Sequence, residues 1–330
     1  MSLYRAEISG PLKEDKMRPR IAETAKTLWL IYTSLTLLCA FAYWLAGMSP
    51  FDAITHSFST VSIGGFSTHD SSMAYFNSPA VNLITVAFLL ISACNYALHF
   101  NAFSNLGKRN IFVSYFRDPE FRFFMFIQIA LVTVCFFMLL TNHHFDGTFK
   151  NLEQAAFQSV SISTTAGYTT SSFDQWPLFL PILLLFASFI GGCAGSTGGG
   201  LKVIRILVLS LQGKRELKRL IHPNLVYPIK LGKRVLDERV IQSIWAFFSA
   251  YLLVFVVCLL GVISCGVETF DAFNAVIACL NNLGPGLGSV SSNFVSIPDS
   301  AKWILTLTMV CGRLEIFSLL VLFTPAFWKS

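Results

Sequence analysis

The stretch EQAAFQSVSISTTAGYT at residues 153–169 decides the fold, because two further stretches of the chain follow the same plan. They are FDAITHSFSTVSIGGFS at residues 51–67 and FDAFNAVIACLNNLGPG at residues 270–286. Each is a short apolar segment that runs to a glycine, and this glycine lies fourteen residues after the first residue in all three. Such agreement in spacing predicts three internal repeats of one structural unit.

The composition around these repeats is that of a membrane protein. Of the 330 residues, 54% are hydrophobic and 13% are charged, whereas about 25% charge is typical of soluble domains. A helix that crosses a bilayer needs about 20 mainly apolar residues. Seven apolar runs are candidates, at residues 28–46, 80–98, 121–140, 178–190, 203–211, 241–264 and 303–323. The runs at 178–190 and 203–211 are short and flank the glycine-rich residues 191–200, so we interpret them as one broken span and expect six spans.

The expected fold is an all-α integral membrane protein built from membrane-pore-membrane units. In each unit a span is followed by a re-entrant pore helix, a glycine loop and a second span. Because each unit crosses the membrane twice, the units share one orientation around an axis along the membrane normal, which predicts a pore. The predicted divisions are a cytoplasmic lead (1–27), pore repeats (28–105, 121–212 and 240–330), a cytoplasmic linker (106–120) and a basic cytoplasmic segment (213–239).

The basic residues predict the orientation. Twenty of the 24 Lys and Arg residues lie in the lead, around the linker at 108–122, and at 202–239. Cytoplasmic loops carry such an excess, so the N-terminus of the chain is expected in the cytoplasm. The opposite loops hold Lys150 and Lys302 against eight acidic residues, which predicts a negative outer mouth. The formal net charge of +6 is therefore explained by topology, and no nucleic-acid partner is expected.

The glycine loops are the candidate ion site. Non-helical backbone at membrane depth is tolerated where it is buried in protein or lines a water-filled cavity. A ring of backbone carbonyls replaces the hydration shell of K⁺ in potassium channels, and the second loop is similar to their Thr-Val-Gly-Tyr-Gly filter. Glycines that cap helices or allow close packing are the alternative. The expected filter residues are Ile63, Gly64, Gly65, Phe66, Thr165, Ala166, Gly167, Tyr168, Asn282, Leu283, Gly284 and Pro285.

These motifs resemble those of the Trk/Ktr/HKT superfamily of cation transporters. The resemblance extends over residues 18–24, 62–70, 164–170, 191–202 and 312–315. It implies four membrane-pore-membrane repeats around one pore, so this chain would hold three of a pseudo-fourfold ring and would be a fragment that lacks the first repeat. It also implies potassium uptake, with K⁺ bound at Gly65, Thr165, Gly167 and Gly284.

The same resemblance implies where the protein works and what it binds. A bacterial inner membrane is the expected location, and potassium is the substrate, with no covalent cofactor. The expected partners are a second copy of the protein in a homodimer and a cytosolic nucleotide-binding regulatory subunit of the TrkA type.

The resemblance further implies a gate in the break of the second repeat. The expected gate residues are Gly191, Gly192, Gly195, Ser196, Thr197, Gly198, Gly199, Gly200 and Lys202, together with Arg313. A close helix crossing made of small residues is the alternative for the break. Arg313 is a basic residue inside a predicted span, which marks a functional position by default. The alternative for Arg313 is a pair with Glu315 or a contact with backbone carbonyls.

Other classes of function fit less well. The eight cysteines fall mostly in apolar runs without a CxxC pair, so no metal site or disulfide framework is expected. An enzyme is not expected either, because residues 200–202 break the phosphate-loop motif and histidines are scarce near Ser196. An intramembrane serine hydrolase that uses Ser196, and a non-conducting fragment, are the alternatives that remain.

Overall fold

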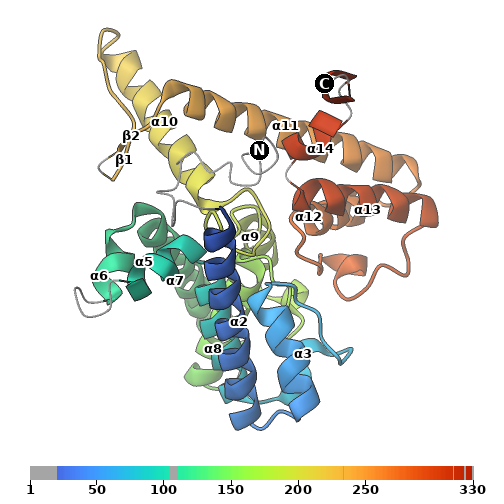
Figure 1. Ribbon diagram of the computed structural model, residues 1–330. Coiled ribbons are helices and arrows are strands. Elements are labelled where there is room, and N and C mark those ends of the chain that lie inside the picture. Colours follow the sequence, from blue (N-terminus) through green and yellow to red (C-terminus); the bar gives the residue numbers. More distant parts are fainter. Residues whose placement is uncertain (1–20, 105–110, 233, 315, 323–324, 329–330) are drawn as a thin grey trace.

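The computed structural model describes residues 21–104, 111–232, 234–314, 316–322 and 325–328, and its regular structure is almost entirely helical (Figure 1). The first repeat holds α2 (Ile21–Leu45), α3 (Pro50–Val61), α4 (Pro79–Ser92) and α5 (Tyr96–Ser104), followed by α6 (Ile111–Arg117). The second holds α7 (Pro119–Thr141), α8 (Thr148–Ser163), α9 (Leu180–Ala187) and α10 (Val203–Ile221). The third holds α11 (Glu238–Ser264), α12 (Thr269–Leu280), α13 (Asp299–Arg313) and α14 (Ile316–Leu322), and α15 (Pro325–Trp328) ends the described chain.

The smaller elements fall between these helices. A two-stranded antiparallel hairpin, β1 (Lys230–Leu231) and β2 (Arg234–Val235), joins α10 to α11. Short 3-10 helices, η1 (Ser72–Phe76), η2 (Phe173–Gln175) and η3 (Gly288–Val290), follow α3, α8 and α12. The expected all-α membrane fold is confirmed, and the order of elements after each short helix is the same in the three repeats.

Three of the described helices are long and apolar enough to cross a membrane by themselves, at Ala25–Leu45, Pro119–Thr141 and Glu238–Ser264. They belong to α2, α7 and α11, which open the three repeats. Start signals in the sequence explain two of their boundaries: Asp118 accepts a hydrogen bond from the N–H of Phe121 ahead of α7, and Asp237 accepts one from the N–H of Arg239 ahead of α11. These spans agree with the multi-pass membrane protein that the composition predicts.

The second span of each repeat is interrupted, and here several predictions were wrong. The continuous span expected at 80–98 is two helices, α4 and α5, which meet at an angle of 91°. A continuous helix would pair the N–H of Ala97 with the carbonyl of Ala93. Instead the N–H of Ala97 donates to Oδ1 of Asn95 at 2.8 Å, and the Ala93 carbonyl accepts the N–H of Cys193 at 2.8 Å.

The second spans of the second and third repeats also differ from the apolar runs that were predicted for them. Helix α9 covers Leu180–Ala187 of the predicted run 178–190, whereas α10 continues to Ile221, ten residues past the predicted end at 211. The run expected at 303–323 is divided into α13, which begins at Asp299, and α14. The predicted break at residues 191–200 is confirmed as non-helical, and it extends over residues 188–202.

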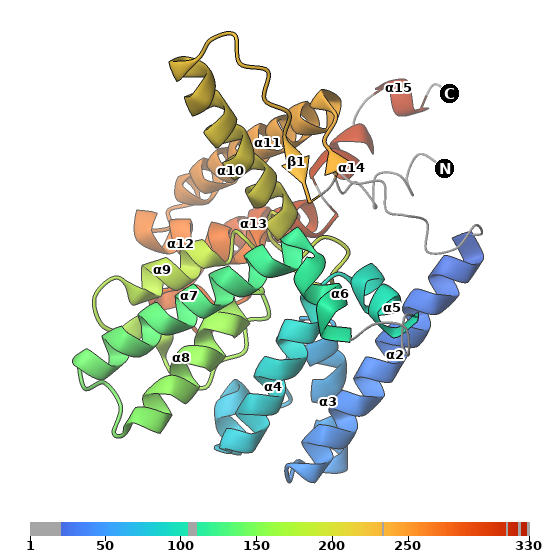
Figure 2. The ribbon, with the colours of Figure 1, turned by 90° about the vertical axis from the view of Figure 1, so that its left-hand side faces the viewer.

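The short helices α8 and α12 lie at the buried centre of the packing, whereas α3 buries one face and exposes Phe51, Ile54 and Phe58 on the other. Helix α8 packs against α7, α4 and α9, whereas α12 packs between α11 and α13 (Figure 2). Nearly every side chain of α12 from Ala272 to Leu280 is buried. By contrast, α7 and α11 expose large apolar side chains such as Phe126, Ile129 and Leu253, which suits a surface that faces lipid.

Candidate functional site: three glycine loops and a central loop

The loops that follow α3, α8 and α12 share one backbone conformation. We call them the first, second and third glycine loops, at residues 62–67, 164–169 and 281–286. Each contains two residues with positive φ separated by one residue that lacks it. The pairs are Ile63 (54°) and Gly65 (68°), Thr165 (69°) and Gly167 (82°), and Asn282 (55°) and Gly284 (96°).

Identical hydrogen bonds end the three short helices. In each loop the N–H groups of the two residues before the glycine return to carbonyls in the last turn of the helix, which is the Schellman arrangement. The bonds run from Ile63 to Thr60 (3.1 Å) and Gly64 to Ser59 (2.7 Å), from Thr165 to Ile162 (3.0 Å) and Ala166 to Ser161 (2.8 Å), and from Asn282 to Cys279 (3.2 Å) and Leu283 to Ala278 (2.8 Å).

The left-handed residue of this turn is usually glycine, but here it is isoleucine, threonine or asparagine. A β-branched residue such as Ile63 or Thr165 rarely takes positive φ, because its Cβ crowds the backbone. Strain of this kind persists where the surroundings impose it, and it concentrates at functional sites. Two strained turns, at Ile63 and Thr165, and a third left-handed turn at Asn282 in the same register make these loops the candidate functional site.

Neighbouring glycine loops touch through their backbones. A Cβ atom at Gly65 would lie 1.8 Å from the carbonyl oxygen of Ala166, and one at Gly167 would lie 1.9 Å from that of Leu283. Both distances exclude any side chain. At Gly284 no atom of the described chain lies within 4 Å of the corresponding position. The first loop thus adjoins the second, and the second adjoins the third, so that the three form an arc with Gly284 at its open end.

A hydroxyl shortly after each glycine loop is hydrogen-bonded to a side chain of the short helix that precedes the loop. The Thr68 hydroxyl donates to Asp52 at 2.7 Å, and the Thr170 hydroxyl donates to Gln154 at 2.7 Å. In the third repeat the Ser289 hydroxyl donates to Asp271. The hydrogen bond from Thr68 is the main cause that lowers the pKa of Asp52, so this carboxylate remains charged at the mouth of the arc.

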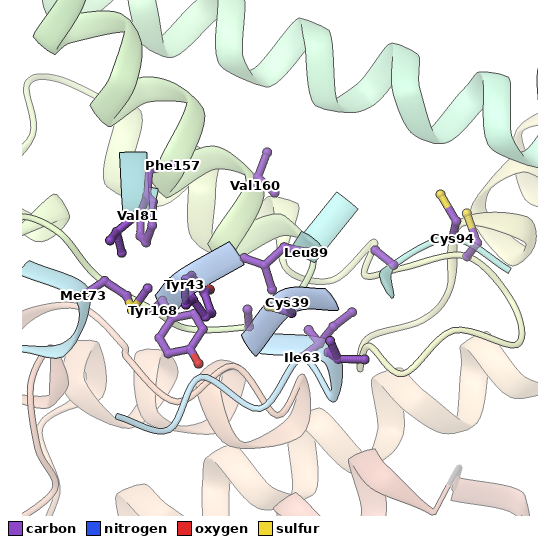
Figure 3. Close-up of a cluster of buried hydrophobic side chains, with 14 of the residues drawn as sticks. Cys39, Tyr43, Ile63, Met73, Val81, Leu89, Cys94, Phe157, Val160 and Tyr168 are labelled. Atoms are coloured by element: carbon purple, nitrogen blue, oxygen red, sulfur yellow. The ribbon is translucent and has the colours of Figure 1, made fainter. Parts of the chain in front are cut away.

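The residues after the glycines have different environments. Tyr168 is fully buried in a cluster with Tyr43, Phe157 and Val81 (Figure 3). Its hydroxyl accepts a hydrogen bond from Thr60 and donates to the carbonyl of His56, so the second loop is anchored on α3 of the first repeat. Phe66, the corresponding residue of the first loop, is 81% exposed.

The segment between α9 and α10, residues 188–202, is here called the central loop. Its middle touches the C-terminal ends of all three short helices. The Thr197 hydroxyl donates to the carbonyl of Val61 at 2.9 Å, and the N–H of Gly199 donates to the hydroxyl of Thr165 at 2.7 Å. A Cβ at Gly199 would lie 2.2 Å from the carbonyl oxygen of Asn281. The central loop therefore lies directly against the inner side of the glycine loops.

Two cationic side chains contact the carbonyls of this loop. The Lys202 ammonium donates to the carbonyls of Ser196 and Gly198, and the Arg313 guanidinium donates to that of Thr197 at 3.0 Å. The structure thus joins Arg313 to the predicted gate residues, as a contact with a backbone carbonyl. The alternative pairing with Glu315 falls outside the described residues.

The two arms of the central loop lie side by side. The N–H of Val203 donates to the carbonyl of Gly192 at 3.0 Å. Cβ atoms at Gly191 and Gly200 would lie 2.1 Å and 2.9 Å from the carbonyl oxygens of Gly199 and Ser188. The glycines of this segment therefore allow the loop to fold back on itself, which a simple crossing of two helices does not require.

Ser196 has no sign of a catalytic environment. Its hydroxyl donates to the carbonyl of Cys193 at 2.6 Å. The ring nitrogens of His99 are engaged by the Tyr115 hydroxyl at 2.7 Å and the Ile91 carbonyl at 3.0 Å. Within the described residues there is also no group of three or more His, Cys, Asp or Glu side chains placed to hold a metal ion.

One residue at this site, Glu120, was not predicted from the sequence. Its carboxylate accepts a hydrogen bond of 2.6 Å from the N–H of Ala194 in the central loop, and the residue is 5% exposed. The sequence at this point has the pattern of an ordinary helix start, with a cap at Asp118, a proline at Pro119 and an acidic residue at Glu120 in the first turn. This pattern carries no signal of a contact 74 residues further along the chain.

The fold and the site define a multi-pass helical membrane protein with three repeated glycine loops. The whole chain, residues 1–330, matches the TrkH family model, described as a cation transport protein. The chain therefore belongs to the TrkH family.

Individual relatives agree with this assignment. The Trk system potassium uptake protein TrkH of Vibrio parahaemolyticus is 64% identical over 330 residues, which are 100% of this chain and 68% of that protein. The Trk system potassium uptake protein TrkG of Escherichia coli K12 is 39% identical over 99% of this chain and 67% of its own length. The crystal structure of the potassium transporter TrkH from V. parahaemolyticus matches with a TM-score of 0.91 at 60% identity, over 99% of this chain and 70% of the other.

Proposed function

We propose that this protein takes up potassium across the bacterial inner membrane through a selectivity filter made by the three glycine loops. The observation that carries the proposal is the strained turn that recurs in one register at Ile63–Gly65, Thr165–Gly167 and Asn282–Gly284. Relatives that are named as potassium uptake proteins support the choice of ion.

The backbone of the loops suits this chemistry. Residues that alternate between positive and negative φ turn successive carbonyls toward one side, and converging carbonyls replace the water around a monovalent cation. Gly65, Thr165, Gly167 and Gly284 are the proposed positions of K⁺ contact. The short helices end at the loops, so the negative ends of their dipoles add a favourable field for a cation on the inner side.

The central loop is proposed to be the gate. It lies at the ends of α3, α8 and α12, where that field is strongest, with Lys202 at its own end and Arg313 of α13 bound to its carbonyl at Thr197. In this position the protein's own cations occupy the region that a permeating ion would use, which opposes conduction. Displacement of the loop from the helix ends would remove the steric barrier and the charge of Lys202, and it would release Arg313 from the Thr197 carbonyl.

The orientation and the partners follow from the charge distribution and the family. The lysines and arginines of the lead, the linker and residues 202–239 favour a cytoplasmic N-terminus. The basic end of α10 and the hairpin β1–β2 offer the surface for a cytosolic nucleotide-binding regulatory subunit of the TrkA type. We further propose that the protein acts as a homodimer.

The test is rubidium uptake into liposomes by the protein and by its Gly167→Ser variant, with sodium as competitor. Uptake that is lost or becomes permissive for sodium in the variant supports the filter. Gly47→Ser is the control, because Gly47 also has positive φ but no atom within 4 Å of its Cβ position. Equal uptake and selectivity in all three proteins would overturn the assignment of the filter.

A further inference from the structure

Glu120 is buried between two helix starts. It lies in the first turn of α7, and its carboxylate also interacts with the N–H of Ile204 in the first turn of α10. Helix α10 begins after Lys202 without a side-chain cap of its own. A carboxylate at this place satisfies N–H groups that the helix leaves unpaired and lies at the positive ends of two dipoles.

The same carboxylate holds the central loop through the N–H of Ala194, at 2.6 Å. Loss of a hydrogen bond to a buried polar group is costly, because no water replaces the missing partner. The bond therefore constrains Ala194, and with it the turn from Cys193 to Ser196. Because Glu120 follows Asp118 and Pro119 directly, the constraint begins where the linker helix α6 passes into α7.

Two further contacts hold this arm of the loop, and both are made by backbone groups. Cys193 donates its N–H to the Ala93 carbonyl at 2.8 Å, and the Gly195 carbonyl accepts the N–H of Tyr96 at 3.3 Å. The opposite arm, at Thr197 to Gly199, makes the contacts with the short helices. The arm from Cys193 to Gly195 is thus held by contacts with Ala93, Tyr96 and Glu120. The contact from Glu120 is made by a side chain, which mutation can remove.

We propose that Glu120 is a positioning residue that anchors the central loop against the glycine loops and couples the loop to the linker between α5 and α7. The inference rests on the proposed gating function. Movement of the start of α7 would be transmitted through the carboxylate to Ala194 and to the start of α10 together. Loss of the carboxylate would leave the loop held by its remaining contacts and would favour displaced positions.

The native Cys193 reports on this anchor without any measurement of transport. It lies one residue before Ala194 and is 2% exposed, so its reaction with a maleimide requires displacement of the loop. The experiment measures the rate of Cys193 modification in the full chain after the other seven cysteines have been replaced by serine or alanine. Basal rubidium flux of the same proteins is measured in parallel.

Three variants distinguish the loss of the contact between Glu120 and the central loop from a general destabilisation of α7. Glu120→Ala is expected to raise the modification rate by about tenfold, the factor that corresponds to one buried hydrogen bond. Glu120→Gln keeps an oxygen for the N–H of Ala194 and is expected to restore much of the protection. Asp118→Ala also removes a carboxylate that acts electrostatically on Cys193, but this carboxylate caps α7 by accepting the N–H of Phe121 at 2.8 Å, and the variant is expected to stay near the parent rate.

The outcomes distinguish the two proposals. An unchanged rate in Glu120→Ala, or an equal increase in Asp118→Ala, would overturn the anchor, since the second result means that any weakening of α7 exposes the loop. If Glu120→Ala exposes Cys193 while rubidium flux stays at the parent level, the role of Glu120 as an anchor is supported and the gating function of the loop is contradicted.

Discussion

The glycine loops and the central loop differ in how they are held. Each glycine loop is fixed by backbone hydrogen bonds that recur in all three repeats and by backbone contacts too close for a side chain. The central loop occurs in the second repeat and adds to its backbone contacts a set of side-chain contacts, from Thr197, Lys202, Arg313 and Glu120. In the first repeat the break at the corresponding place is short, at residues 93–95.

The difference teaches how one chain combines a rigid site with a movable one. Repetition of a strained backbone turn produces a set of equivalent carbonyls that no single side chain controls. An extension in one repeat produces a segment that contacts all the repeats and that separate side-chain contacts can release. Substitutions in the glycine loops should therefore damage structure and selectivity, whereas substitutions around the central loop should change basal flux.

The largest effect is expected for Gly167→Ala. The new Cβ would lie 1.9 Å from the Leu283 carbonyl oxygen at a residue with φ of +82°, so both overpacking and backbone strain destabilise the arc. Together they should lower the free energy of unfolding by roughly 3 kcal/mol or more and abolish selective uptake. Thermal unfolding of the purified protein checks the first effect, with Gly47→Ala as the control. A normal melting temperature would show that the arc is softer than its backbone contacts indicate.

Next in size is Arg313→Gln, which tests the central loop. The variant loses the charge that faces the Thr197 carbonyl, so the loop should leave the helix ends more readily. Basal rubidium flux should rise by about tenfold, while the preference for rubidium over sodium stays the same. Arg219→Gln, at an exposed arginine that pairs with Glu216, serves as the matched control. A change in selectivity without a change in basal flux would place Arg313 with the filter instead.

A smaller effect is expected for Tyr168→Phe. The variant loses a hydroxyl that bonds Thr60 at 3.3 Å and the His56 carbonyl at 3.4 Å in a buried cluster. The free energy of unfolding should fall by about 1 kcal/mol, because the lost bonds are long and their partners remain buried. Phe66→Leu, at the exposed corresponding residue, should leave stability almost unchanged. Equal losses in the two variants would mean that the first and second loops have the same surroundings.

A similarly small effect on stability is expected for Gly284→Ala. Its φ of +96° is unfavourable for alanine, but no described atom lies near the added Cβ. The free energy of unfolding should therefore fall by about 1 kcal/mol, which is the cost of the unfavourable backbone conformation alone. A melting temperature as low as that of Gly167→Ala would contradict the open end of the arc.

The sequence by itself determined the repeats, the membrane class and the position of the central break. A constant spacing of fourteen residues to a glycine is a local property, and so is the hydropathy of α2, α7 and α11. The glycines at 65 and 167 were also visible, although the sequence left open whether they served a filter or helix packing. Their neighbours Ile63 and Thr165 gave no sign of positive φ, because their types favour the opposite.

Only the tertiary structure decided the contacts that join distant parts of the chain. The bend after α4 depends on the Cys193 N–H at the Ala93 carbonyl, and the burial of Glu120 depends on Ala194. The meeting of Arg313 with Thr197 spans 116 residues. Periodicity and propensity describe residues a few positions apart, so they carry no information on which carbonyl a distant N–H or guanidinium reaches.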